Sequence, residues 1–292
     1  MDGRADRGAL AASLGMAAAA LVFVGPLCFM VSSSLKPDHQ IFSDLRSARA
    51  FLPVGEISLE NYRSVLAQSN LPRYLFNSIL ISLSTVALGV VVNSMAAFGL
   101  QRLTWRGQGA LVGLVLALLV VPFELTALPL MLIVSRVPGL GIEDGILVWT
   151  ASWFDTFYVQ VVPFAGNAFS IFLFHQMFKD IPHELDEAAQ MDGAGWFTIY
   201  ARVVMPNAGP AVGTSAIVLF LAMWNQYLWP TLVVPSETWR PVMVGLQQFF
   251  GPENAWGEIM AYATLITLPV LTVFVLFQRQ FVQSVARAGL KG

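Results

Sequence analysis

The residues of this chain that could do chemistry are few, and the densest group of them is acidic. A polar stretch between two strongly apolar segments carries five carboxylates: Asp180, Glu184, Asp186, Glu187 and Asp192. His183-Glu184 opens like the His-Glu-x-x-His helix of a zinc protease, but position 187 is Glu and the second histidine is missing. Because this ligand set is incomplete, we predict no metal site and no enzyme of that kind.

The same stretch is predicted to form a helix on which another protein can dock. Pro182 fits the first turn of a helix, where its missing N–H costs nothing, and the acidic residues after it lie near the positive end of the helix dipole. Leu185, Ala188 and Ala189 share one apolar face of this helix, and the two alanines let a partner's backbone come close. Gly193 is a natural helix terminator.

The alternative for this segment is a connector that lies flat on the membrane surface. Helices of that kind favour Lys and Arg, which face anionic lipid. The helix predicted here is acidic instead. Its charge therefore favours a protein partner over a lipid surface.

One further carboxylate and one group of polar and aromatic residues lie inside apolar segments. Glu124 either lines a solute path or hydrogen-bonds within a helix bundle, since a carboxylate inside a membrane is costly and usually faces a cavity or a partner. The group could form a wall for a sugar, with rings against C–H groups and amides against hydroxyls, or could belong to the aromatic belt at the membrane interface. Its members are Trp224, Asn225, Gln226 and Tyr227.

Composition requires that membrane helices position these residues. The chain is 56% hydrophobic and 12% charged, whereas a soluble domain carries about 25% charged residues. The formal net charge of −2 offers no basic surface for nucleic acid, and the single cysteine, Cys28, excludes a disulfide framework within the chain. No Gly-x4-Gly-Lys-Ser/Thr phosphate loop occurs, so ATP hydrolysis by that mechanism is excluded.

Apolar stretches long enough to cross a membrane predict six helices in this chain. A span needs about 20 mainly apolar residues, and the predicted spans are 8–34, 74–101, 108–135, 156–178, 207–234 and 259–279. The first is too long for the core of a signal peptide and is predicted to be retained. The third contains Glu124 and is predicted to be one span, kinked near Pro122 and Pro129.

Basic residues next to the spans predict the orientation of the chain. Arg102 with Arg106, and Arg279 with Arg287, bracket short segments, and an excess of basic residues marks the cytoplasmic side. Both termini and the polar loop 179–206 are therefore predicted to be cytoplasmic.

The polar loop resembles the cytoplasmic loop of ABC-importer permeases. Their pattern is Glu-Ala-Ala, three residues, Gly, nine residues and Ile-x-Leu-Pro. The residues that fall on it are Glu187, Ala188, Ala189, Gly193 and Pro206, with Val203 for the Ile and Met205 for the Leu. Further motifs resemble the carbohydrate branch, of which the maltose transporter is the familiar member: Asn77-Ser78, 96–100, 224–230, 278–282 and 289–292. The stretch Gly141–Trp153 is longer than is usual in that branch.

This resemblance implies an all-α membrane protein with the six-helix, MetI-like fold of type I importers, as a single permease domain over 1–292. Such a permease would form half of a pore for a sugar or related polyol in the plasma (inner) membrane of a bacterium or archaeon. Its partners would be a homologous second permease, two ATP-binding-cassette ATPases, an extracytoplasmic substrate-binding protein and membrane lipid. ATP and magnesium would belong to the ATPases, and this chain would bind no cofactor.

The resemblance also implies which residues meet the ATPases. Part of the loop 182–206 would enter a groove on one ATPase: Leu185, Glu187, Ala188, Ala189, Asp192 and Gly193. The C-terminal tail would run between the two ATPases through Gly289, Leu290, Lys291 and Gly292.

Other functions remain as alternatives. A permease for another solute, such as glycerol phosphate, fits the same motifs. An ion-coupled secondary transporter would want several ionisable residues within its spans, often in inverted repeats, whereas Glu124 stands nearly alone. A membrane-embedded enzyme would need a nucleophile and base, or metal ligands, within the spans, and the sequence shows neither.

Overall fold

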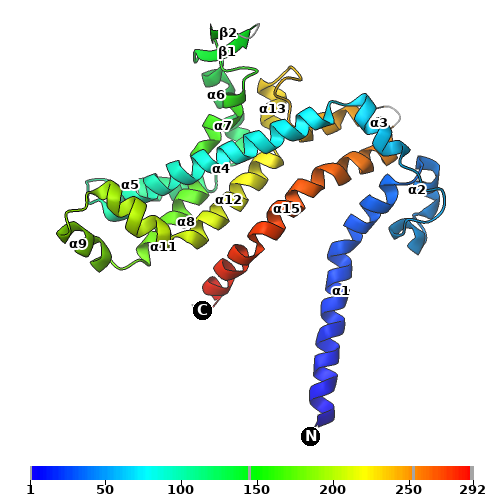
Figure 1. The fold of residues 1–292 in the computed structure, drawn as a ribbon, viewed down its shortest axis with the longest axis horizontal. Helices are drawn as coiled ribbons and strands as arrows, with labels where there is room; N and C mark the ends of the chain where they lie inside the picture. The colour runs from blue at the N-terminus through cyan, green and yellow to red at the C-terminus, as the bar shows by residue number, and fades with distance from the viewer. Residues whose placement is uncertain (1, 144–145, 252–253, 290–292) are drawn as a thin grey trace. The chain divides into compact units, whose positions relative to one another are not determined.

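A computed structural model describes residues 2–143, 146–251 and 254–289 (Figure 1). The chain divides into two compact units. Unit 1 comprises Met1–Pro72 and Gly245–Pro269, and unit 2 comprises Arg73–Val244 and Val270–Gly292. Two long helices, α4 (Leu71–Arg102) and α15 (Trp256–Gly289), each have residues in both units.

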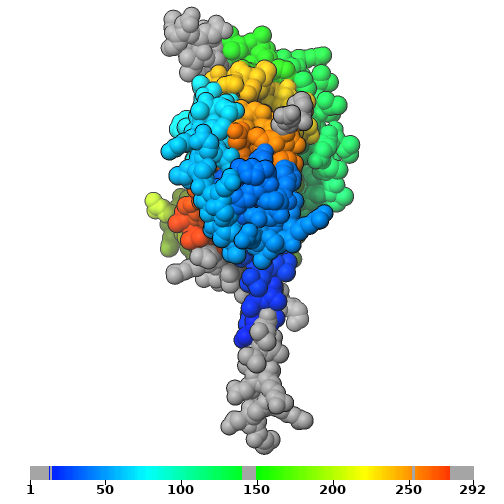
Figure 2. Space-filling view, turned by 90° about the vertical axis from the view of Figure 1, so that its right-hand side faces the viewer, coloured from blue at the N-terminus to red at the C-terminus, as the bar shows by residue number. Residues whose placement is uncertain are grey.

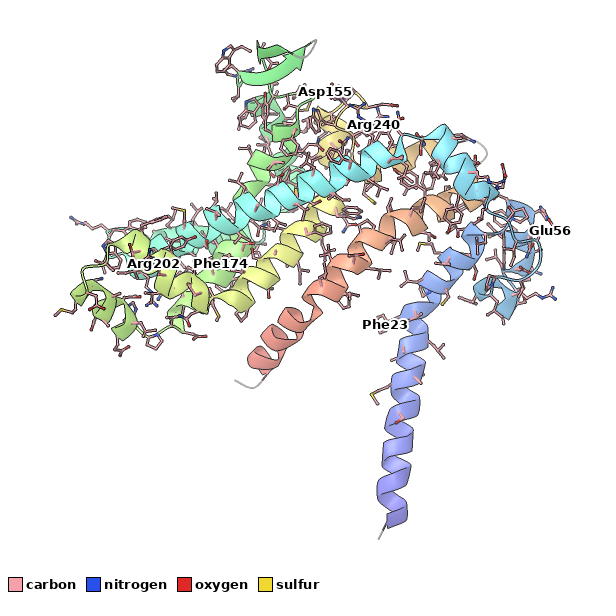
Figure 3. All side chains as sticks on the ribbon, in the orientation of Figure 1. Phe23, Glu56, Asp155, Phe174, Arg202 and Arg240 are labelled. Atoms are coloured by element: carbon pink, nitrogen blue, oxygen red, sulfur yellow. The ribbon has the colours of Figure 1, made fainter. Side chains whose placement is uncertain are left out.

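Unit 1 combines one long helix with a polar cap. The helix is α1 (Asp2–Ser34), and Figure 2 shows its described part as a column that projects from the cap. Its side chains are largely exposed in this single chain, Phe23 by 79% (Figure 3). The cap contains α2 (Asp38–Asp44), the 3-10 turns η1 (Ala48–Phe51) and η3 (Leu246–Phe249), and α3 (Glu60–Gln68).

A buried lysine organises this cap. The Lys36 ammonium donates to Asp44 Oδ2 at 3.0 Å and to the Arg49 carbonyl at 2.7 Å, so its charge is compensated where water is excluded. The hydrogen bond from Lys36 holds the pKa of the Asp44 carboxyl below its usual value. The Asp38 carboxylate accepts from the backbone N–H groups of Trp256 and Gly257 at 3.1 and 2.7 Å, which caps the first turn of α15.

Unit 2 is a helical bundle with one small hairpin. The helices after α4 are α5 (Gln108–Leu118), α6 (Phe123–Val134), α7 (Phe157–Ala165), α8 (Ala168–Lys179), α9 (Glu184–Met191), α10 (Trp196–Ile199), α11 (Met205–Asn207), α12 (Gly209–Trp224), α13 (Leu228–Val233) and α14 (Val242–Gly245). A π-helical turn, η2 (Tyr200–Val204), joins α10 to α11. The predicted helical fold class is confirmed.

The hairpin is an addition to the predicted all-α fold. Strands β1 (Gly139–Glu143) and β2 (Ile146–Thr150) pair antiparallel, with Gly139 opposite Thr150 and Glu143 opposite Ile146. From Gly141 onward the hairpin lies in the stretch Gly141–Trp153, which is longer than usual in the carbohydrate branch. Ile146 to Thr150 is rich in β-branched and aromatic residues, which favour a strand.

Three helical segments are each long and apolar enough to cross a bilayer: Gly15–Ser34, Leu71–Arg102 and Trp256–Leu276. Three bent pairs of helices raise the number of candidate spans in the described chain to as many as six, if each pair crosses as one span. The bends are 108° between α5 and α6, 41° between α7 and α8, and 82° between Trp196–Asn207 and α12.

The breaks differ in detail from the predicted kinks. The turn between α5 and α6 precedes Pro122, which is the N-cap of α6, while Pro129 continues inside that helix. The segment predicted as a fifth span to residue 234 is interrupted, because α12 ends at Trp224 and α13 is separate. An uncharged sequence does not reveal such breaks, because side chains of neighbouring helices can bond to the backbone groups that a break or a proline leaves without a partner.

A side chain of α4 holds the break between α7 and α8 together. Asn93 is fully buried; its amide donates to the Ala165 carbonyl at 3.0 Å and its carbonyl accepts from the Asn167 N–H at 2.8 Å. A helix break leaves such groups without intrahelical partners, and lipid offers none. Gly89 permits the close approach, since a Cβ there would lie 2.7 Å from the Leu219 side chain and 3.3 Å from the Ala165 carbonyl.

A tryptophan of α13 compensates for a proline in α7. Pro163 has no N–H, so the Val159 carbonyl, four residues earlier, lacks its helical donor. The Trp229 indole N–H donates to that carbonyl at 2.9 Å. Trp229 is fully buried among residues of α6, α7, α13 and the C-cap of α13: Val134, Val159, Val233 and Val234.

Candidate functional site

The predicted docking loop begins with a short exposed helix, α9. It starts after Pro182, with His183 at its N-cap and three acidic residues in its first turn. Gly193 ends it with φ +83° and donates its N–H to the Gln190 carbonyl at 2.9 Å, and the next residue donates to the Ala189 carbonyl. A left-handed glycine with these two bonds is a standard helix stop, so this part of the loop folds as its local sequence predicts.

The structure leaves most of the predicted docking residues on the surface. Leu185, Glu187, Ala188 and Asp192 are exposed, and no atom lies within 4 Å of a Cβ built on Gly193. Ala189 is half-buried against the core beneath. The predicted apolar face is therefore divided: Leu185 and Ala188 point to solvent, and Ala189 turns toward the bundle.

The exposed apolar surface extends past α9. Met191 is 89% exposed and Phe197, at the start of the next helix, is 72% exposed. Neither residue belongs to the predicted docking set, although a methionine and a phenylalanine in a polar loop are a visible signal in the sequence. Large exposed apolar side chains on a folded loop are typical of an interaction surface.

A buried ion pair lies at the base of α9. Arg102, the last residue of α4, places its Nε 3.2 Å from Asp186 Oδ2, and the two side chains are 0% and 5% exposed. Sequence reasoning used Arg102 only as a marker of orientation and Asp186 only as a helix-dipole charge. Nothing local in the sequence links two residues so far apart along the chain.

An apolar cluster lies beneath the rest of the loop. Phe98 of α4 contacts Trp196, Tyr200 and Phe178, with ring centroids 6.3, 5.5 and 6.5 Å apart. Ser94 shares a 2.8 Å hydrogen bond with the Tyr200 hydroxyl. In Figure 3, Phe174 lies within the bundle and Arg202 lies in the last part of the loop. The cluster consists of Ala97, Phe98, Phe174, Phe178, Ile181, Ile199, Val204, Ala208 and Ala211.

The predicted solute-path residues do not share one face. Trp224 is 2% exposed and stacks on Phe220, with centroids 5.5 Å apart. Asn225 is exposed and donates to the Leu221 carbonyl at 2.9 Å, and Tyr227 is exposed as well. Gln226 is half-buried and lines a cavity of about 10 Å³, with room for about one water at most, and with neighbours that include Ser78, Gln160 and Trp229.

Glu124 and the C-terminal tail complete the predicted residues. Glu124 is exposed in the first turn of α6, where the positive end of the helix dipole stabilises a carboxylate. The tail residues Leu290, Lys291 and Gly292 lie outside the described residues, and Gly289 is described only as the last residue of α15. In the part of the chain that the structure describes, no three His, Cys, Asp or Glu side chains group closely enough to hold a metal ion.

Apolar helices long enough to cross a membrane, with an exposed acidic helix between two of them, define a protein of the multi-span membrane class. The chain belongs to the family of binding-protein-dependent transport system inner membrane components, whose model matches residues 86–287. It is therefore a permease component of such a transport system and a membrane protein.

Relatives with described transport roles support the branch. The lactose transport system permease protein LacG of Rhizobium radiobacter is 30% identical over 268 residues, covering 91% of this chain and 90% of LacG. The arabinooligosaccharides transport system permease protein AraQ of Bacillus subtilis is 28% identical, covering 93% and 92% of the two chains. The resemblance to permeases of carbohydrate ABC importers is confirmed.

A solved structure supports the fold. A chain of a bacterial ABC transporter involved in the import of the acidic polysaccharide alginate superposes with a TM-score of 0.74. The two chains are 22% identical, and the match covers 96% of this chain and 98% of the other. The permease fold therefore extends over nearly the whole chain.

Proposed function

We propose that this chain imports a sugar or a related polyol, as half of the pore of an ATP-driven, binding-protein-dependent importer. The observation that carries the proposal is the exposed acidic helix α9, which ends at Gly193 and is fixed to α4 through Asp186. The relatives support the solute class, because they are named for lactose and arabinooligosaccharides. A permease for glycerol phosphate is the alternative within the same architecture.

The remaining half of the pore and the energy source come from other proteins. All eleven residues of α5 are described and none of them is buried, although the helix is uncharged and apolar. Such a helix requires lipid or a second permease against it. ATP and magnesium would be held by two ATPases that dock on Leu185, Glu187, Ala188, Ala189, Asp192 and Gly193, with the tail 289–292 between them. A substrate-binding protein would dock on the outer face.

The solute path would be lined by polar groups that face outward in the single chain. Glu124, Asn225 and Tyr227 are exposed, and an ionisable side chain at membrane depth faces water or a protein partner rather than lipid. Gln226 and the buried Trp224 would shape that wall from behind.

Both termini and the loop 179–206 are predicted to face the cytoplasm of a bacterial or archaeal cell. Single cysteines at Arg106 and Gln190, in a Cys28→Ala background, should react with a membrane-impermeant maleimide only after the membrane is opened. Cysteines at Glu56 and Gln247 should react in intact cells, since all four positions are exposed or adjoin exposed turns and lie in the predicted loops. Labelling of position 190 from outside would refute the docking assignment.

Reconstitution tests the proposed function directly. The chain is co-expressed with its partner permease, ATPase and binding protein, and uptake into proteoliposomes is measured with radiolabelled lactose, trehalose, arabinotriose and glycerol 3-phosphate. Uptake should require ATP and the binding protein, and should favour a carbohydrate. The purified chain alone should not hydrolyse ATP above background. Uptake by this chain alone, driven by an ion gradient, would contradict the proposal.

A further inference from the structure

We infer that the ion pair between Arg102 and Asp186 is a rigid link through which movement of α9 is passed to α4. The inference rests on the proposed function, in which an ATPase moves α9 during its cycle. It assigns Arg102 and Asp186 a positioning role, since neither contacts solute. The link determines how much of each ATPase movement reaches the pore.

The guanidinium of Arg102 joins three points of the loop at once. Its Nε lies 3.2 Å from Asp186 Oδ2, one terminal nitrogen donates to the Ile181 carbonyl at 2.8 Å, and the other lies 2.9 Å from His183 Nδ1. His183 Nδ1 is itself 3.7 Å from Asp186 Oδ2. The contact with Asp186 is an ion pair without a hydrogen bond, because Arg102 Nε and both Asp186 oxygens lack a hydrogen-bond partner within the described chain. The first turn of α9 is therefore held to the end of α4 by this buried charge pair together with the contacts to Ile181 and His183.

This link holds the one residue of α9 that is buried. Of the eight residues of α9, all of which the structure describes, only Asp186 is buried. Ala189 is half-buried against the apolar cluster, while Leu185, Glu187 and Ala188 are exposed. A load applied to the exposed face therefore passes to the bundle chiefly through Asp186.

The helix that receives the load is suited to pass it on. α4 is continuous for 32 residues and ends at Arg102. One side chain of its interior, Asn93, bridges the break between α7 and α8, and α8 leads directly into the loop. Movement at α9 would thus reach both α4 and the α7–α8 break together.

Apolar packing alone would hold the loop without fixing α9. Phe98, Tyr200 and Trp196 pack under the following segment and would keep it seated if the ion pair were lost. Packing of this kind tolerates small rotations, whereas a buried ion pair whose guanidinium is also bonded to Ile181 and His183 resists them. Loss of the pair is therefore expected to weaken coupling more than attachment.

The test uses the assembled importer and near-isosteric variants. Arg102→Gln and Asp186→Asn each remove one charge, and Arg102→Gln/Asp186→Asn removes both, so that no charge is left buried alone. Arg102→Lys keeps the charge without the planar fork. Glu184→Gln is the matched control, because Glu184 is an exposed acid of the same turn. ATPase retention, binding-protein-stimulated hydrolysis and solute uptake per ATP hydrolysed are measured for each.

We expect the double variant to retain the ATPase and to hydrolyse ATP, while uptake per ATP falls about tenfold or more, within the usual range of coupling between sites. The uptake per ATP of Arg102→Lys should lie between the values of this variant and the wild type, and the uptake per ATP of Glu184→Gln should equal the wild-type value. A wild-type ratio in the double variant overturns the inference, even if the single variants assemble poorly, because the pair then serves stability alone. Failure of the wild-type complex to transport would count against the proposed function instead.

Discussion

Replacement of Gly193 by proline is expected to abolish solute uptake, by at least about a hundredfold, while the chain still inserts and pairs with its partner permease. Gly193 has φ +83°, and proline is restricted to about −65°. Proline also removes the N–H that donates to the Gln190 carbonyl at 2.9 Å. Both changes unwind the end of α9, so the residues from Glu187 to Gly193 can no longer enter a preformed groove as one rigid element.

Gly193→Ala separates backbone strain from disruption of the turn. A Cβ at this position meets no atom within 4 Å, so the only cost is that of a left-handed alanine, about 1–2 kcal/mol. That energy shifts the population of the docked turn by roughly tenfold, far less than proline does. The measurements are retention of the ATPase on the purified permease pair and ATP-dependent uptake. Wild-type retention and uptake in Gly193→Pro would rule out this loop as the docking element.

A charge reversal tests the acidic part of the same surface. Glu187→Lys is expected to weaken ATPase retention, because Glu187 is exposed and belongs to the pattern of the loop. Glu184→Lys changes the same charge in the same turn, outside that pattern, and should have a smaller effect. Equal losses in the two variants would indicate a general field of negative charge rather than one specific contact.

Features of this protein that depend on local sequence were predictable. The helix α9 and its glycine stop follow from Pro182, the acidic first turn and Gly193, all within a dozen residues. Long apolar runs likewise predicted α4 and α15, since a membrane helix must satisfy its own backbone. The exposed residues of α9 that we propose for docking needed only this local pattern, because no other part of the described chain packs on them.

Features that depend on distant partners were not predictable. Arg102 and Asp186 meet only because α4 packs against α8, which leads into α9. Nothing in the sequence around one of these two residues predicts its contact with the other. The end of α7 and Pro163 within it fall inside an uncharged run, where Asn93 and Trp229 supply the missing hydrogen-bond partners from other helices. Composition alone therefore overestimated the continuity of the helices within these segments.

Trp229→Ala is expected to cause the largest loss of stability in unit 2. The indole is fully buried and packs edge-on against Phe123 and Phe164, with ring centroids 6.1 and 5.9 Å away. Removal of a buried tryptophan side chain costs about 3–5 kcal/mol in cavity and contact energy. The Val159 carbonyl also loses the donor that Pro163 cannot supply. Thermal or denaturant unfolding of the permease in detergent micelles measures the loss.

Trp229→Phe isolates the hydrogen bond from the packing. An aromatic ring remains against Phe123 and Phe164, so the expected cost is nearer to that of one hydrogen bond between membrane helices, about 0.6–1.7 kcal/mol. Pro163→Ala provides the matched correction, because alanine restores an N–H that can donate to the Val159 carbonyl within α7. The Trp229→Phe loss should therefore be smaller in a Pro163→Ala background than in the wild type.

The four proteins of this cycle decide between two roles of Trp229. If the indole N–H replaces the donor missing at Pro163, Trp229→Phe and Pro163→Ala are coupled. The double variant is then more stable than the sum of the single changes predicts, and the difference exceeds the usual scatter of about 0.3–0.5 kcal/mol for independent sites. If Trp229 acts through packing alone, the two changes are additive. Additive losses would contradict the assignment and leave the Val159 carbonyl to be satisfied in another way.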